Sequence, residues 1–364
     1  MNQPPAPSDT ASETLSKTSA RTGVTAPVAS TLTQAPVGGP IRFNDPNRKD
    51  EMYHQYNLTL QYEFAPNWLG EVAYVGSLGR NLLTLTNIGT GNDEGGPGSR
   101  EVTGVGAITA TRFNARSSYN ALQTKLEKRF SRSLSILSTY TWAHAIDTSP
   151  GGICSNGASA RDCGPDDPLR PELERGSSDT DVRHRFTFSN VYDLPIGRNR
   201  RYLQNIPRAL DLVIGGFQLN NIVQWQSGPV YNVTCNGGRV DLLGDPTPTD
   251  ADRAAGRQLN RAAFRCATTR IFPSDPSSPH IGTLGRNVFR GDNQFYWDAT
   301  LFKNFPVPSI SEAFNVQFRF SAYNVLNHVN RSSPNGDINN TNDFGRDISE
   351  QRRRQMEFSL KLIF

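Results

Sequence analysis

Residues 55–64 read Gln-Tyr-Asn-Leu-Thr-Leu-Gln-Tyr-Glu-Phe, with an apolar or aromatic side chain at every even position and a polar one at every odd position. Successive side chains of a β-strand point to opposite faces, so this alternation predicts a strand with one apolar and one polar face. Similar runs recur at about 68–85, 118–130, 133–145, 182–194, 217–226, 294–304, 314–327 and 352–364. We therefore predict an all-β fold of about nine long strands.

The connections between these runs differ in length at the two ends of the predicted sheet. Those at one end have 3 residues (65–67 and 131–133), 9 residues (305–313) and 22 residues (195–216). Those at the other end have 24 to 66 residues (87–117, 146–180, 228–293 and 328–351). A soluble β-sandwich shows no such asymmetry, but outer-membrane barrels combine short periplasmic turns with long extracellular loops. We therefore expect an antiparallel transmembrane β-barrel whose carboxyl terminus lies on the periplasmic side.

Composition and local motifs exclude several other classes of protein. The chain has 38 Lys and Arg against 34 Asp and Glu, a formal net charge of +4, and we expect no nucleic-acid partner. It lacks an apolar stretch long enough for a transmembrane helix, although barrel strands give only a weak hydropathy signal. A Gly-x-Ser-x-Gly nucleophile motif and clustered metal ligands are also absent from the sequence, so we expect no enzyme activity, cofactor or metal.

The first part of the chain differs in composition from the rest. Residues 1–40 contain several prolines and no aromatic residue, and no apolar segment typical of a signal peptide follows Lys17 or Arg21. Such a segment buries too little apolar surface to offset the entropy of ordering. We expect residues 1–45 to be disordered or loop-like and residues 50–364 to form a partial barrel.

The four cysteines fall within two of the long connections. Cys154 and Cys163 share the connection 146–180, and Cys235 and Cys266 share the connection 228–293. An even number of loop cysteines is typical of disulfides in an oxidising compartment, with four unpaired thiols as the alternative. We predict the disulfides Cys154–Cys163 and Cys235–Cys266.

The strand assignment also predicts which side chains face lipid. It places Trp68 at an inner strand end and Trp142, Trp225 and Trp297 near outer ends, as expected for an aromatic girdle. The predicted lipid-facing set comprises Leu134, Ile136, Tyr140, Phe186, Phe188, Phe217, Leu219, Phe318, Phe358 and Leu360.

Several blocks, taken together and in order, resemble the C-terminal barrel portion of Oar-like TonB-dependent outer-membrane receptors. The resemblance covers about residues 50–364. Its blocks are 119–131 (YNALQTKLEKRFS), 138–144 (STYTWAH), 181–186 (DVRHRF), 193–197 (DLPIG), 216–219 (GFQL), 226–228 (QSG), 285–287 (GRN), 290–291 (RG), 318–328 (FRFSAYNVLNH) and the terminal Phe364.

The resemblance implies an energised transporter of the outer membrane of a Gram-negative bacterium, with a barrel of about 22 strands closed by an N-terminal plug domain. This chain shows neither plug nor TonB box, so we expect it to be a C-terminal fragment that meets the TonB complex only through the missing plug region. The expected function is energised uptake of an unidentified substrate. The alternative is a passive structural or adhesive barrel whose surface loops bind ligands.

The final strand carries apolar side chains at every second position, namely Met356, Phe358, Leu360, Leu362 and Phe364. In the receptors that the chain resembles, a terminal strand ending in Phe is the signal read by the outer-membrane barrel assembly machinery. The resemblance therefore implies outer-membrane lipid and this machinery as partners.

Overall fold

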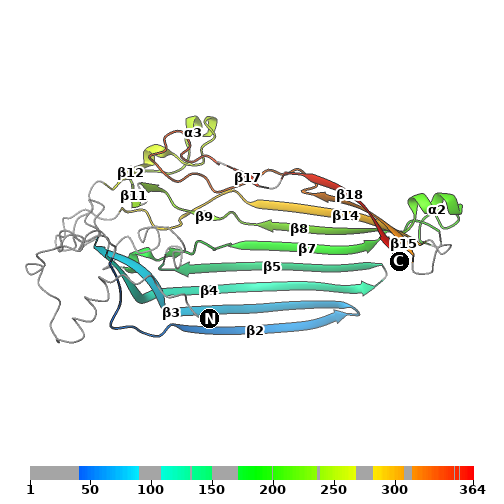
Figure 1. Ribbon diagram of the computed structural model, residues 1–364, viewed down its shortest axis with the longest axis horizontal. Helices are drawn as coiled ribbons and strands as arrows, with labels where there is room; N and C mark the ends of the chain where they lie inside the picture. Colours follow the sequence, from blue (N-terminus) through cyan, green and yellow to red (C-terminus); the bar gives the residue numbers. More distant parts are fainter. Residues whose placement is uncertain are drawn as a thin grey trace, which may run out of the picture.

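The computed structural model describes residues 41–89, 108–131, 133–149, 171–198, 200–235, 238–267, 282–306, 314–347, 349–351 and 353–364. Its dominant feature is one long, curved sheet whose strands run side by side along the longest axis of the molecule (Figure 1). Within the described residues, none of the helices is long and apolar enough to span a membrane.

The sheet is a meander in which each long strand pairs antiparallel with the next along the chain. Its main path runs through β2 (Met52–Ala65), β3 (Trp68–Gly89), β4 (Ile108–Ser131), β5 (Leu134–Asp147), β7 (His184–Asp193), β8 (Phe217–Gln226), β14 (Gln294–Pro306), β15 (Asn315–Tyr323) and β18 (Gln355–Ile363). β2 and β18 lie at opposite edges and do not pair with each other, so the described sheet is open.

Short connections gather at one end of this sheet, which we call the inner end, and long ones at the outer end. The tightest inner turns use Asn67 and Ser133, both with positive φ. The connection from β7 to β8 contains the short helix α2 (Arg208–Ile214), which lies at the same end as the carboxyl terminus in Figure 1. The described residues of the four long connections therefore lie at the outer end.

The hairpin of β3 and β4 is longer than the sequence predicts. We expected a loop over 87–117, but residues 108–117 belong to β4, which pairs with β3 as far as Gly89. The buried Thr84 hydroxyl donates to Asn114 Oδ1 at 2.9 Å within this extension. The prediction was wrong because loop-like composition does not exclude strand structure when a neighbouring strand satisfies the backbone.

The amino-terminal boundary also needs correction. β1 (Ile41–Asn44) pairs parallel with residues 108–111 of β4, although it lies within the segment 1–45 that we expected to be disordered or loop-like. The extension of β4 supplies the edge on which this short strand forms. Residues 1–40 lie outside the described residues.

β15 ends earlier than predicted, at Tyr323 rather than near residue 327. Asn324 and Asn327 adopt positive φ, and the Asn324 side chain donates to the carbonyl of His328 and accepts from its backbone N–H, both at 2.9 Å. The backbone of Asn324 also donates to Asp298 Oδ1. The asparagines of this block therefore stop the strand and fix the turn against β14.

The described part of the longest predicted loop is a folded unit, which we call the outer domain (residues 229–235, 238–267 and 282–290 together with 330–347). It contains β9 (Val230–Tyr231), β10 (Thr234–Cys235), β11 (Gly238–Leu242), α3 (Asp250–Ala254), η3 (Arg261–Ala263), β12 (Phe264–Cys266), β13 (Phe289–Arg290) and the start of the β16–β17 pair (Asn330–Arg331 with Glu350–Gln351). Val240 and Phe344 are fully buried in its core, where Phe264 packs between Phe344 and Phe289. Two separate connections thus share one hydrophobic core.

Candidate functional site: the two faces and outer end of the sheet

The register assigns each side chain of the sheet to a face, because directly opposed residues of antiparallel strands lie on the same face. Tyr140 lies opposite Phe186, Phe186 opposite Trp225, and Trp225 opposite Phe295. We call the face that carries these residues the apolar face and the other the polar face. The complete predicted lipid-facing set lies on the apolar face: Leu134, Ile136, Tyr140, Phe186, Phe188, Phe217, Leu219, Phe318, Phe358 and Leu360.

All four tryptophans also lie on the apolar face. Trp68 begins β3 at the inner end, whereas Trp142, Trp225 and Trp297 lie in the outer parts of β5, β8 and β14. Indole rings favour membrane interfaces because they combine a large apolar area with one hydrogen-bond donor. Their two levels match the two edges expected of an apolar band.

The imidazole of His184 packs among the aromatic rings near the outer end of the apolar face. The ring of His184 lies 6.2 Å from that of Tyr140 and 6.3 Å from that of Trp225, measured between centroids. The Tyr140 hydroxyl lies 2.8 Å from His184 Nδ1, so these two polar atoms are partners. His184 therefore has a structural role on the apolar face.

Two inner-end lysines on the apolar face were not predicted. Lys128 Nζ donates to the carbonyls of Ser131 and Leu134 at 2.8 and 2.7 Å and lies 5.9 Å from the centre of a Trp68 ring. Lys303 Nζ donates to the carbonyls of Asp211 and Leu212 at the end of α2.

Each of these ammonium groups is held by backbone carbonyls and aromatic rings, as expected of a cation that anchors a strand at the membrane interface. The Lys303 ammonium lies 5.0 and 4.9 Å from the ring centres of Phe217 and Phe305. The sequence offered one indication of these anchors: each lysine lies near an inner strand end, at a position where the alternation otherwise places an apolar residue.

The polar face carries charged and amide side chains across several strands. Lys125 and Glu127 form an ion pair at 2.8 Å on β4. On β7 and β8, Arg185 Nε donates to Gln226, and the Gln226 amide donates to Gln294 on β14 at 2.7 Å. Such a surface is typical of the lumen of a large barrel, where water or a plug satisfies polar groups.

A buried arginine ties the outer domain to the sheet. Arg286 is only 5% exposed and pairs with Asp147 at the end of β5 and with Asp179. Its Nε also donates to the carbonyl of Glu174 at 3.1 Å, near η2 (Pro171–Glu174) and β6 (Gly176–Ser177). A buried guanidinium without a partner would destabilise the folded state. The pairing of Arg286 with Asp147 therefore fixes the position of the outer domain relative to β5.

A second group of polar contacts lies beside it. Arg290 pairs with the buried carboxylate of Asp181, which also accepts from the backbone N–H of Ala145 at 2.7 Å and lies 3.4 Å from His144 Nδ1. Nearby, an added Cβ at Gly228 would meet the Gly291 carbonyl oxygen at 1.8 Å, so only glycine permits this backbone approach. Several blocks that carry the family resemblance thus meet at one outer site.

A disulfide joins Cys235 to Cys266 across the outer domain. Both sulfurs lie near the side chain of Asn339, which comes from the connection between β15 and β18. Cys154 and Cys163 lie outside the described residues. The disulfide thus links β10 to β12 at the place where the two parts of the outer domain meet.

We expect the unreduced protein to contain both predicted disulfides. Closing the loop between Cys235 and Cys266 should stabilise the outer domain by about 3 kcal/mol, because the link restricts the unfolded chain. Alkylation followed by mass spectrometry, with and without prior reduction, checks this prediction. Labelling of all four cysteines without reduction would contradict it.

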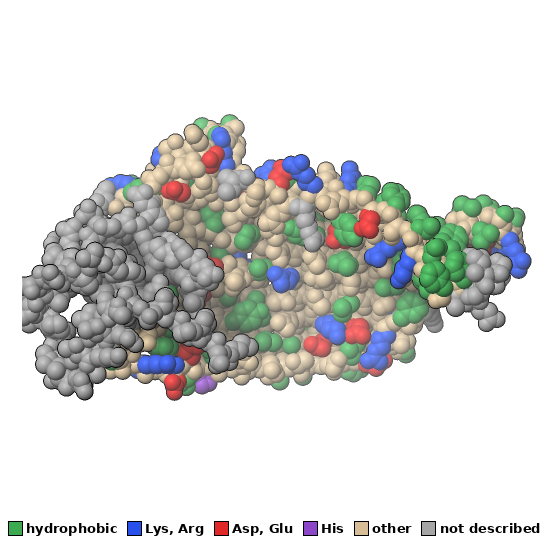
Figure 2. Space-filling model, viewed as in Figure 1, with side chains coloured by type: hydrophobic (Ala, Val, Ile, Leu, Met, Phe, Trp, Pro, Cys, Tyr) green, Lys and Arg blue, Asp and Glu red, His purple; other side chains and the backbone are tan. Residues whose placement is uncertain are grey.

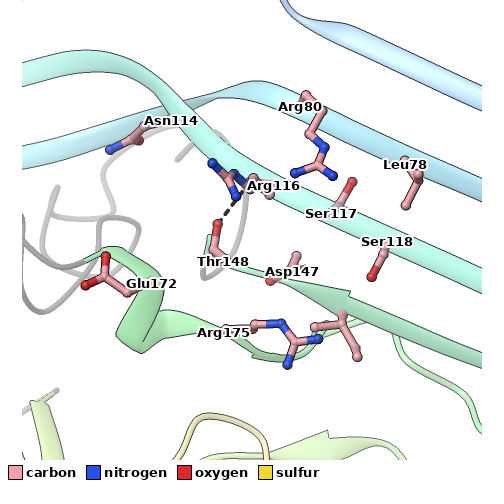
Figure 3. Close-up of a pocket in the computed structure, with 11 residues that line it drawn as sticks. Leu78, Arg80, Asn114, Arg116, Ser117, Ser118, Asp147, Thr148, Glu172 and Arg175 are labelled. Carbon is pink, nitrogen blue, oxygen red and sulfur yellow. Dashed lines mark hydrogen bonds between the residues drawn. The ribbon is translucent and has the colours of Figure 1, made fainter.

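A pocket of about 470 Å³ opens at the outer ends of β3, β4 and β5. Arg80, Arg116 and Arg175 line it, together with Glu172 and Asp147, and Figure 3 shows the Arg80 and Arg116 side chains entering the same space from neighbouring strands. Sequence reasoning missed this pocket. In the described part of the chain, no group of three or more His, Cys, Asp or Glu side chains is placed to hold a metal ion.

A long antiparallel sheet with an apolar face, two aromatic levels and a polar opposite face has the construction of a transmembrane barrel wall. The chain belongs to the outer membrane beta barrel domain family, whose profile matches residues 1–357, and it is therefore an outer-membrane protein. No match among curated proteins was found.

Two solved structures are similar to the chain. The outer membrane transporter YddB from Escherichia coli is 10% identical with a TM-score of 0.49, over 90% of this chain and 35% of that protein. The closed form of the ferric-catecholate import receptor Fiu from E. coli K12 is 10% identical with a TM-score of 0.41, over 92% of this chain and 30% of that protein. The chain thus spans about a third of the length of either protein.

Proposed function

We propose that the chain is the C-terminal part of the barrel of a TonB-dependent receptor that takes up an unidentified substrate with energy from the inner membrane. The observation that carries this proposal is the open sheet, in which β2 and β18 do not pair with each other. Unpaired strand edges are not tolerated in lipid, because their backbone groups find no water there. Further strands of a larger protein would close the barrel by joining the edge at β2 to the edge at β18.

The polar face supports a plugged lumen. Its charged and amide side chains, such as Lys125, Glu127 and Arg185, extend along the middle of the sheet, and Figure 2 shows blue and red side chains scattered over the curved surface in view. A plug domain would contact these groups and would carry the link to the TonB complex. Binding and transport, rather than catalysis, are the proposed activities.

The outer domain favours a second candidate, a passive structural or adhesive barrel with ligand-binding loops. Its own hydrophobic core and disulfide make it more than a flexible connection, and a rigid exposed domain suits attachment to surface ligands.

The two candidates differ in their dependence on energy. We expect loss of the full-length parent gene and loss of TonB to leave the same compounds unconsumed in the growth medium, as measured by mass spectrometry of spent medium. The matched control is a strain that lacks only the outer domain of the parent protein. Normal consumption in the strain without the parent gene, together with weakened surface attachment, would instead support the adhesive barrel.

A further inference from the structure

The pocket at the outer ends of β3, β4 and β5 is lined by three exposed arginines with no carboxylate partner among the described residues. Elsewhere at the outer end, Arg239, Arg286 and Arg290 each pair with a carboxylate. The guanidiniums of Arg80, Arg116 and Arg175 form no such pair in the described chain. Unlike the charges of Arg239, Arg286 and Arg290, their charges are not neutralised by a described carboxylate.

The pocket itself offers little negative charge to balance them. Of its two carboxylates, Asp147 is engaged by Arg286, which leaves Glu172 against three guanidiniums. Like charges brought together on adjacent strands repel each other, and a bound anion relieves that repulsion. Arginine is suited to phosphate because its planar fork donates two parallel hydrogen bonds to one phosphate group.

The position of the arginines on the sheet indicates where this anion comes from. Ser118 lies opposite both Leu78 and Ile146, so these three residues share one face. Ile146 is four residues from Trp142 on the same strand, and an even spacing along a strand keeps the face, so this is the apolar face. Arg80 and Arg116 each lie two residues outward from Leu78 and Ser118 on the same strands. A soluble substrate inside the lumen would meet the polar face instead.

The height of the pocket agrees with this placement. Ile146 is four residues beyond Trp142, which corresponds to roughly 13 Å along the strand and less across a membrane that the strand crosses at a tilt. The headgroups of a bilayer begin a few ångströms beyond its hydrocarbon core. The arginines therefore lie where the phosphates of the outer leaflet are expected.

We infer that Arg80, Arg116 and Arg175 form a binding site for a phosphorylated lipid headgroup of the outer leaflet. Neutralising the three cations with lipid phosphate would anchor the long β3–β4 hairpin against the membrane surface. The inference requires only the outer-membrane location of the chain and is independent of energised transport.

The test measures binding of purified lipid A to the full-length protein in detergent by native mass spectrometry. The variant R80Q/R116Q/R175Q should bind lipid A at least about tenfold more weakly, since it loses three cationic donors of charge-assisted hydrogen bonds to phosphate. The matched control R129Q/R185Q/R319Q removes the same charge from the polar face and should bind like the wild-type protein. Lipid A without its phosphates should bind the wild-type protein as weakly as lipid A binds the pocket variant.

Heat-modifiable migration establishes that each variant is folded. Should the triple variant fail to fold, Arg116→Lys keeps the charge but not the bidentate geometry, and it should still weaken lipid A binding. Wild-type affinity in the pocket variants, or equal binding of lipid A without phosphates, would overturn the inference. Displacement of lipid A by millimolar inorganic phosphate would overturn it in favour of a soluble-anion site.

Discussion

Replacing Phe188 with arginine is expected to cost the folded barrel about 2–4 kcal/mol, because it places a cation at the lipid-facing middle of β7. Phe188 lies opposite Ser138 and Val223 on the apolar face. An arginine at this position would therefore point toward lipid, away from the charged and amide side chains of the polar face. Equilibrium unfolding of the full-length protein in lipid vesicles measures this cost.

The neighbouring residue supplies the control. Thr187 lies opposite Thr139 and Gln224 on the polar face, where an arginine can remain hydrated. Thr187→Arg should therefore change the free energy of unfolding far less than Phe188→Arg. Equal costs at the two positions would mean that the assignment of faces is wrong.

Deleting Phe364, or replacing it with Asp, is expected to reduce the membrane-inserted population of the full-length parent protein to a small fraction of the wild-type level. Phe364 is 86% exposed and stacks against Phe314 at a centroid distance of 6.1 Å. Upstream on the same strand, Phe358 packs against Phe320 at 4.7 Å. Since a side chain this exposed contributes little to packing, a large loss would report recognition during assembly.

Heat-modifiable protein in outer-membrane fractions measures this population, and total protein by immunoblot shows whether synthesis is unchanged. Phe364→Tyr keeps an aromatic terminus and should assemble normally. Wild-type amounts of folded barrel after deletion of Phe364 would exclude the proposed role of the terminal strand.

Local sequence pattern predicted the presence of the strands better than it predicted where they begin and end. The alternation in residues 55–64 correctly indicated β2, but the same reasoning placed the start of β4 about ten residues too late. Ile108–Ser117 reads as loop by composition and becomes strand because β3 provides hydrogen-bond partners along its length. Strand ends therefore depend on the neighbouring strand as much as on the residues themselves.

The sequence by itself determined which side chains share a face, because the period of two is a local property of an extended backbone. Only the tertiary structure decided what gathers at the ends of the strands. Phe344 meets Phe264 in the core of the outer domain, and Lys303 meets the last carbonyls of α2, across some eighty to ninety residues of chain. Arg80, Arg116 and Arg175 line one pocket for the same reason. Contacts of this kind form because strand pairing brings distant parts of the chain together, and no local pattern of residues encodes that pairing.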